Sequence, residues 1–470
     1  MSDSGTGLRR ELTLFGIIAI AAGSVLGGWL AEAPYWFQLT GAGAAFVFPI
    51  LAVLLVPVGL AFSELTSMLP FSSAVDVWSG NAMHPTVGWA TQWLFFLVQV
   101  VEPPLVAYIF VSAAGYFVDV PTAVKPLIAI GIMVLWYIFS NLRINLTGIL
   151  AIVFFIAMLV ITVIVSIYFF LSGHWHLVNI SQHGGFFPFG FTGAVLGGAA
   201  LVLKYIGFGM TPTLIQEARF PAKKMVTVII SALFIPAVVY LLATLAMGGL
   251  APHATIARMS LPAPELVGKL DMVGAIAILA IIAGLLYAFT TLMGFWASSA
   301  RVLYGSSQLR QLPPWFTKTN SQGQPYIANL VVLAFGVFFA IFTNTNFVQY
   351  IYSLSVVAAG AVYFMVCLSA YILRDKHPEW ERPYRTPAGK PLFVIGMAVS
   401  AAVAIVGVTL LPANAWLPIA IYVVIGILIP FAMKYYRRQH GYAYDPIVLT
   451  PDDAVDTAYE IPDRKGTQEQ

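Results

Sequence analysis

Four ionisable residues lie inside long apolar segments of the chain, and their side chains could do chemistry there. They are Glu32, Glu64, Glu102 and Lys204. Charged groups inside membrane-spanning segments are costly to bury and usually serve a function. Glu102 directly precedes two prolines, and burial disfavours a charged carboxylate, which suits this residue to proton coupling. A packed, hydrogen-bonded acid at a proline kink is the alternative interpretation of Glu102.

Two more of these residues each allow two interpretations. Glu32 is a solvated carboxylate near the outer end of its segment, or it attracts cationic substrates into an outer vestibule. Lys204 is a lysine that reaches toward an aqueous cavity, or it is a movable cation at the binding site. In the second case Glu102 is a candidate partner for Lys204.

Further polar residues are candidates for gating or coupling. Glu64 is a gate or a structural acid, with Arg143 or Arg301 as its partner. A sodium ion would need hard oxygen ligands, such as backbone carbonyls of the first segment and hydroxyls of the eighth. Thr290 and Ser298 are the hydroxyls that we select for this role, although such hydroxyls usually bond to their own helix.

Two of the apolar segments are interrupted by glycines in corresponding places. The first contains Gly23-Ser24-Val25-Leu26-Gly27-Gly28, and the sixth contains Gly207-Phe208-Gly209-Met210-Thr211-Pro212. Unwound backbone inside a membrane is tolerated only where it is buried or lines a cavity. Paired interruptions therefore indicate a transporter binding site. Close helix packing through small residues is the alternative.

Broken helices of this kind can bind both ends of an amino acid. Free N–H groups from about Val25 to Gly28 would attract a carboxylate, with help from the helix dipole. Carbonyl oxygens from about Lys204 to Gly207 would attract an ammonium group. Aromatic side chains beside the unwound turns could cap the substrate. The candidate substrate contacts are Gly23, Ser24, Val25, Gly27, Gly28, Trp29, Tyr108, Tyr205, Gly207 and Phe208.

The composition tells us which elements must position these residues. Of the 470 residues, 60% are hydrophobic and only 9% are charged, whereas a soluble domain carries about 25% charged residues. This composition excludes a soluble enzyme. The single cysteine excludes an internal disulfide. The net charge of +3 is too small to indicate a nucleic-acid partner. Segments long enough to cross a bilayer predict an all-α polytopic membrane protein. The twelve expected transmembrane helices cover residues 12–37, 43–69, 88–118, 124–140, 147–171, 190–212, 225–249, 271–304, 326–343, 347–373, 391–411 and 414–434.

Loop charges predict the orientation of these helices. With twelve spans, most of the 23 Lys and Arg residues fall on the side that holds both termini. The positive-inside rule places that side in the cytoplasm, so we expect a multi-pass protein of the cytoplasmic membrane, surrounded by lipid. The expected organisation is a cytoplasmic N-terminus (1–11), a five-helix repeat (12–171), an inverted five-helix copy (190–373), two extra helices (391–434) and a disordered cytoplasmic tail (435–470).

Several stretches resemble the amino acid–polyamine–organocation permeases. They are Gly23-Ser24-Val25-Leu26-Gly27, Ser63-Glu64-Leu65, Tyr205-Ile206-Gly207-Phe208, Arg301-Val302-Leu303-Tyr304 and Arg382-Pro383-Tyr384-Arg385-Thr386-Pro387. The resemblance implies a leucine-transporter-like fold, a 5+5 inverted repeat with broken helices 1 and 6, that works by alternating access. It also implies an amino acid or small amine bound between those helices. The chain departs from the family at Trp29, where the family has glycine, and at Gly209, where the family often has an acidic residue.

These features together predict a secondary transporter rather than an enzyme. No Gly-x-x-x-x-Gly-Lys motif is present, so ATP-driven transport is not expected. We expect no cofactor and no metal site. The expected partners are an amino acid and a coupling proton, or exchange of one substrate molecule for another. The alternatives are an organic amine or polyamine as substrate, sodium as the coupling ion, and a membrane receptor or intramembrane enzyme.

Overall fold

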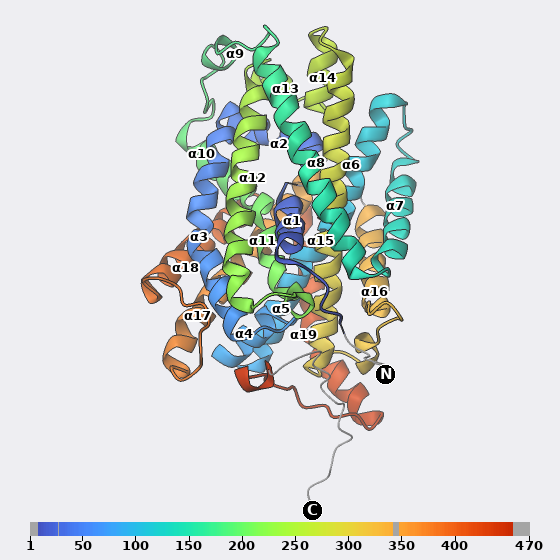
Figure 1. Cartoon of the computed structure of the whole chain (residues 1–470), viewed down its shortest axis with the longest axis vertical. Coiled ribbons are helices and arrows are strands. Elements are labelled where there is room, and N and C mark those ends of the chain that lie inside the picture. Colours follow the sequence, from blue (N-terminus) through green and yellow to red (C-terminus); the bar gives the residue numbers. More distant parts are fainter. Residues whose placement is uncertain (1–7, 27, 342–346, 455–470) are drawn as a thin grey trace, which may run out of the picture.

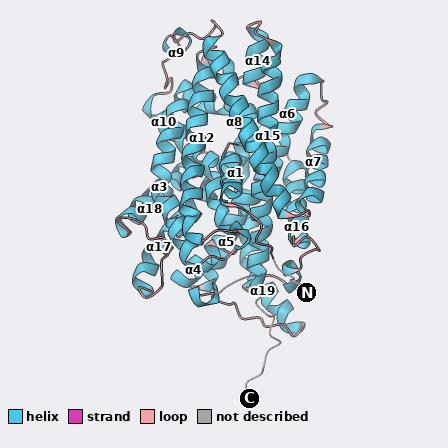
Figure 2. Cartoon of the chain, in the orientation of Figure 1, coloured by secondary structure: helices cyan, strands magenta, loops and turns pink. Residues whose placement is uncertain are grey.

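The structure of the protein is a computed structural model that describes residues 8–26, 28–341 and 347–454. The described residues are helical and contain no β-strand, apart from one isolated bridge between Leu12 and Ala218 (Figure 2). The longest helices run roughly along the long axis of the molecule (Figure 1). The main helices are α1 (Leu14–Val25), α2 (Trp29–Thr40), α3 (Ala44–Met68), α4 (Val75–Ala82), α5 (Pro85–Val100), α6 (Glu102–Phe117), α7 (Lys125–Ser140), α8 (Ile144–Leu171), α10 (Gly190–Leu201), α12 (Met225–Gly248), α14 (Pro262–Lys269), α15 (Gly274–Gln308), α16 (Tyr326–Ile341), α17 (Phe347–Lys376), α18 (Lys390–Thr409) and α19 (Trp416–Gln439).

Many helices of this fold are long enough to span a membrane. Among the described residues, nine helical stretches are long and apolar enough to cross a bilayer, and three shorter apolar helices accompany them. Each of the twelve ranges expected from the sequence overlaps one of these helices. The first stretch, Trp29–Met68, joins α2 to α3 through the one-turn 3₁₀ helix Gly41–Gly43. The protein is therefore a multi-pass membrane protein.

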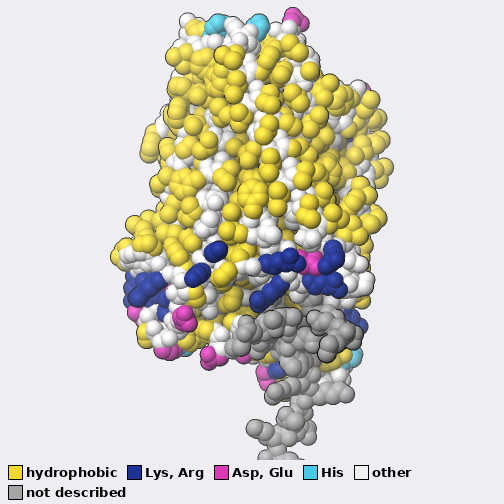
Figure 3. Space-filling model, viewed as in Figure 1, with side chains coloured by type: hydrophobic (Ala, Val, Ile, Leu, Met, Phe, Trp, Pro, Cys, Tyr) yellow, Lys and Arg dark blue, Asp and Glu magenta, His cyan; other side chains and the backbone are white. Residues whose placement is uncertain are grey.

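Helix α1 lies in the interior of the bundle. Its residues from Gly16 to Val25 are all buried, and it packs against α8, α12 and α15 (Figure 1). A helix that is apolar all round and surrounded by others belongs to a core. Helix α8 shows the opposite arrangement on its outer face, where Ile149, Val153, Ile156 and Val160 are exposed at helical spacing. The face of the molecule seen in Figure 3 is apolar over most of its length, as contact with lipid requires.

Lysine and arginine side chains gather near one end of the molecule (Figure 3). We call this the basic end, and it carries Arg9, Arg143 and Arg219 beside the start of the described chain. The chain that follows α19 also lies here and packs on the bundle. Ile447 donates a backbone hydrogen bond to Leu309 (3.2 Å), and the carbonyl of Leu449 accepts one from Asn81 (2.8 Å). The part of the expected disordered tail up to residue 454 is therefore in contact with the helices.

Candidate substrate-binding and coupling site

The first helix break separates α1 from α2. Helix α1 ends at Val25, and α2 begins at Trp29 with Gly28 as its N-cap. Gly27, which we expected to contact substrate, lies outside the described residues. The break falls inside the expected glycine-rich stretch, so the first backbone N–H groups of α2 begin in the middle of the bundle, where no preceding helical turn accepts their hydrogen bonds.

The second break differs from the unwound turn that the sequence suggests. Helix α10 passes at Val202 into a 3₁₀ helix (Val202–Tyr205), then into the short α11 (Gly207–Met210) and a second 3₁₀ helix (Thr211–Glu217). The Ile206 carbonyl accepts a hydrogen bond from Gly209 N (3.0 Å), so part of the expected acceptor set is already used. A tighter helical pitch, rather than open coil, replaces the α-helix here.

Gly207 brings the two breaks together. A Cβ atom on Gly207 would lie 2.9 Å from Val25 Cγ2 and 3.1 Å from Val25 N. Only a residue without a side chain lets the two backbones approach this closely. Tyr240 of α12 adds a hydrogen bond from its hydroxyl to the carbonyl of Val25. The interrupted ends of the two segments therefore form one packed site.

A buried ion pair joins the two segments at this site. Lys204 Nζ lies 2.8 Å from Oε1 and 2.7 Å from Oε2 of Glu32, and both side chains are almost fully buried, at 5% and 3% exposed. The Glu32 carboxylate folds back over the start of α2, since a Cβ on Gly28 would lie 1.6 Å from Oε1. The solvated, interfacial Glu32 that we expected is therefore wrong. Lys204, which we considered as a partner of Glu102, forms its ion pair with Glu32.

Glu102 is the third charged residue of the site. It opens α6 directly after the turn that ends α5, and Pro103 follows it in the first helical turn. Its side chain is 3% exposed, and its Oε1 has no hydrogen-bond partner among the described residues. Lys204 and Glu32 both act on it electrostatically. A buried carboxyl in this setting is costly to hold as an isolated charge.

The aromatic candidates divide between the site and its surroundings. Trp29 packs edge-on against Tyr287 of α15, with ring centroids 6.0 Å apart. Tyr205 donates its hydroxyl hydrogen to the Phe48 carbonyl of α3 (2.7 Å). Phe208 is buried next to Phe62 (5.6 Å between ring centroids). These three side chains form the wall of the site, where their rings pack against neighbouring helices.

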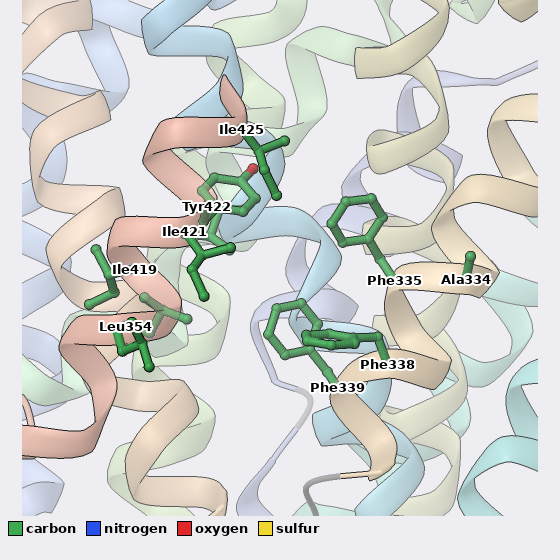
Figure 4. A pocket seen from close by; sticks show the side chains of 11 residues that line it. Ala334, Phe335, Phe338, Phe339, Leu354, Ile419, Ile421, Tyr422 and Ile425 are labelled. Atoms are coloured by element: carbon green, nitrogen blue, oxygen red, sulfur yellow. The ribbon is translucent and has the colours of Figure 1, made fainter. Parts of the chain in front are cut away.

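Tyr108 lies apart from this wall. It lines a polar cavity of about 350 Å³ between α6, α7 and α14, together with Asp119, Lys125 and Glu265. Another cavity, of about 530 Å³, lies between α5, α16, α17 and α19 (Figure 4). Its lining is apolar except for Tyr422, whose hydroxyl donates to the Trp93 carbonyl (2.7 Å). Because a charged substrate needs polar partners, the apolar cavity is a poor candidate for the transport site.

The hydroxyls considered for sodium bind protein atoms. Ser24 Oγ donates to the Thr290 carbonyl (3.1 Å), which links α1 to α15, and Gly23 packs directly against Thr290. The Thr290 hydroxyl donates to Tyr287 O (2.8 Å). Ser298 lies about 12 Å further along the same helix and accepts from Thr213 (3.1 Å). Thr290 and Ser298 are therefore not brought together around one point.

Glu64 belongs to a different cluster, at the basic end. Both of its oxygens bind the guanidinium of Arg374 (2.9 and 2.6 Å), and Oε2 also accepts from the backbone of Thr386 (2.7 Å). The partners expected for Glu64 are therefore wrong. Arg143 pairs with Glu11 (2.6 Å) and Arg301 with Glu217 (2.8 Å). The two members of each pair lie on segments far apart in the sequence, so hydropathy and loop charge could not predict which residues would pair.

Sequence reasoning missed the role of Glu32 and the contributions of Tyr240 and Tyr287. One signal could have found the first, since Glu32 and Lys204 carry opposite charges and each stands near a helix break. A charge buried in an apolar segment needs such a partner. Nothing in the sequence separates Tyr240 or Tyr287 from the other tyrosines of the chain, because their roles arise from packing against α1 and α2.

Known proteins resemble this chain over almost its whole length. A family model described as amino acid permease matches residues 12–433. The methylthioribose transporter of Bacillus subtilis (strain 168) is 25% identical, over 92% of this chain and 95% of its own length. A branched-chain amino acid permease of Lactococcus lactis subsp. cremoris is 25% identical over 93% and 97%. A gamma-aminobutyric acid permease of B. subtilis is 22% identical over 80% and 82%. With its buried charges at two meeting helix breaks, the chain belongs to the amino acid permease family of the amino acid–polyamine–organocation superfamily.

Proposed function

We propose that this protein is a secondary permease that carries an amino acid across the cytoplasmic membrane by alternating access. The substrate binds where α1 and α2 meet the segment from Val202 to Met210. The observation that carries the proposal is the Glu32–Lys204 pair with Glu102 beside it, buried where two interrupted segments touch. Fixed charges at membrane depth are expensive and mark a substrate or ion pathway. The amino acid permeases among the relatives support the same substrate class.

Proton coupling through Glu102 is the coupling mode that we propose. Glu102 has an oxygen without a partner in the described part of the chain and stands beside a cation and an anion. The hydroxyls considered for sodium support a proton instead, since Thr290 and Ser298 lie about 12 Å apart along α15, too far apart to bind one ion. Exchange of internal for external amino acid remains compatible with the same site.

The proposed topology has twelve spans in a 5+5 inverted repeat with two further helices, and both termini in the cytoplasm. The belt of lysine and arginine at the basic end supports this orientation. Ion pairs close the bundle at that end. They link Glu11 to Arg143, Glu217 to Arg301 and Glu64 to Arg374. We assign these pairs to the inner gate.

An uncharged, polar solute is a second candidate substrate. Glu32 and Lys204 neutralise each other in this conformation, and an uncharged molecule could bind beside the closed pair without replacing either charge. The relative described as a methylthioribose transporter supports this candidate.

Uptake into liposomes tests both candidates. Purified protein is reconstituted, and entry of each labelled amino acid is followed in sodium-free buffer with and without an inward proton gradient. Methylthioribose is tested in parallel. Accumulation of an amino acid driven by the gradient is the expected result. Uptake that needs only internal amino acid would replace symport by exchange, and transport of methylthioribose alone would overturn the amino acid assignment.

A further inference from the structure

The Glu32 carboxylate occupies a position that suits the carboxylate of a substrate. It lies over Gly28 at the start of the twelve-residue helix α2, where helix N-termini favour anions. Both of its oxygens lie within 3 Å of Lys204 Nζ. The Glu102 side chain, 3% exposed and with Oε1 unpartnered among the described residues, stands in electrostatic range of the pair. The site thus contains an internal anion and an internal cation in direct contact.

We propose that Glu32 and Lys204 determine specificity by exchanging ion pairs with a zwitterionic substrate. The substrate enters between the two side chains, its carboxylate replaces Glu32 on Lys204, and its ammonium group binds the released Glu32. This inference rests on the proposed function and adds the residues that bind the two charged groups of the substrate.

Charge balance explains the selectivity. Before binding, Glu32 faces Lys204, and after binding two ion pairs share the same space, so neither side chain of the pair and neither end of the substrate is left without a partner. A simple amine would satisfy Glu32 and leave Lys204 unpaired, whereas a simple carboxylic acid would do the reverse. Leaving one buried charge uncompensated is strongly unfavourable. We therefore expect either compound to bind at least about 100-fold more weakly than the zwitterion.

Single neutralising variants should invert this preference. In E32Q, Lys204 has lost its internal anion, so the site should favour the acid that lacks an amino group. In K204M, Glu32 has lost its internal cation, so the site should favour the amine that lacks a carboxylate. For leucine, the acid is 4-methylpentanoate and the amine is isopentylamine.

The experiment is competition binding with purified full-length protein, using the amino acid that gives the largest uptake together with its matching acid and amine. We expect the acid-to-zwitterion affinity ratio to rise at least about 10-fold in E32Q, and the amine-to-zwitterion ratio to rise as much in K204M. The control is E379Q, which alters a glutamate whose side chain is 62% exposed and should leave both ratios as in the wild type.

The double variant E32Q/K204M keeps the test valid if a single variant does not fold, because it removes both charges at once. It should bind the uncharged N-acetyl amide of the amino acid as well as the amino acid itself. Unchanged affinity ratios in both single variants would overturn the proposed ion-pair exchange, and so would a wild-type preference for the zwitterion in the double variant. Either result would leave the proposed function as an amino acid permease unaffected. If the wild type binds methylthioribose and no amino acid, the proposed function itself fails.

Discussion

The three buried glutamates that we selected differ in the charged or polar groups that compensate their carboxylates. Glu64 is held by two arginines, Arg374 and Arg382. Glu32 forms an ion pair with one lysine, Lys204, and Glu102 has an oxygen without a hydrogen-bond partner in the described chain. Fully compensated acids stabilise one arrangement of their helices, whereas a partly compensated one responds when neighbouring charges move. This difference supports the coupling role that we propose for Glu102.

Replacing Glu102 by glutamine tests that coupling role. We expect E102Q to lose accumulation driven by the proton gradient and to retain exchange of internal for external amino acid, because the amide cannot carry a proton between the two faces. Uptake and exchange in liposomes give the two readouts. The matched control is E379Q, which alters an exposed glutamate (62% of its side chain). Undiminished accumulation by E102Q would remove Glu102 from the coupling mechanism.

At the scale of the elements, the contact between α1 and α11 decides the geometry of the site. Gly207 lies against Val25 and near the Ala21 carbonyl, so the two interrupted segments share one point of close approach. Helix α1 is in turn hydrogen-bonded to α15 through Ser24 and to α12 through Tyr240. A shift of α11 would therefore move the carboxylate and the ammonium of the ion pair relative to each other.

Adding a methyl group at Gly207 should disturb this contact. The new Cβ of G207A would be 2.9 Å from Val25 Cγ2, so the segments must separate, and we expect uptake to fall roughly 10- to 100-fold. The control is G131A on α7, where a Cβ meets no atom within 4 Å. That variant should transport normally and keep or slightly gain thermal stability. Normal uptake by G207A would show that the site tolerates a wider separation.

Helix α4 carries a titratable group outside the candidate spans. Asp76 is buried, accepts a hydrogen bond from Gln311 (3.0 Å) and has an oxygen without a partner in the described chain. Burial raises the pKa of Asp76 to about 7, while the hydrogen bond from Gln311 acts in the opposite direction. Between pH 4 and 7 the folded protein therefore holds a proton that the unfolded chain has lost.

Stability should consequently fall as pH rises through this window and level off above pH 7, where both states are ionised. The variant D76N removes the titration. We expect the wild type to lose on the order of 2–4 kcal/mol relative to D76N between pH 4.5 and 8. Thermal unfolding in detergent across this range measures the difference between the two proteins. A difference that does not change with pH would show that Asp76 does not titrate in the folded state.

At the scale of the whole molecule, charge is distributed along the long axis. Exposed basic residues include Arg9, Arg10, Lys223 and Lys224, and lysine and arginine side chains gather at the basic end (Figure 3). Helices α9 (Val178–Ser181), α13 (His253–Ile256) and α14 lie at the opposite end (Figure 1). Positive residues are retained on the cytoplasmic side during membrane insertion. The distribution of charge therefore predicts orientation without reference to the site.

Cysteine labelling in intact cells tests the orientation. The only native cysteine, Cys367, is fully buried, so H174C and K223C introduce thiols at exposed positions. We expect a membrane-impermeant maleimide to label H174C from outside and K223C only after permeabilisation. The reverse pattern would place the basic end outside the cell.

The sequence by itself determined the helical segments and the positions of their breaks. The length of an apolar segment identifies a membrane-spanning helix, and a glycine-rich stretch within it identifies a break in that helix. Both features can be read from neighbouring residues in the sequence. The break between Val25 and Trp29 lies within the expected stretch, and each expected span overlaps a helix. The second break was predicted in place but not in form, because a glycine-rich stretch marks an interruption without determining whether the backbone opens into coil or tightens into a 3₁₀ helix.

Only the tertiary structure decided which charges meet. Glu32 and Lys204 are 172 positions apart, and Glu64 and Arg374 are 310 apart, so local patterns alone do not determine their pairing. A charge buried in an apolar segment must find a partner, and the sequence can state that need. The partner is determined by helix packing, which places α2 against α10 and α3 against α17.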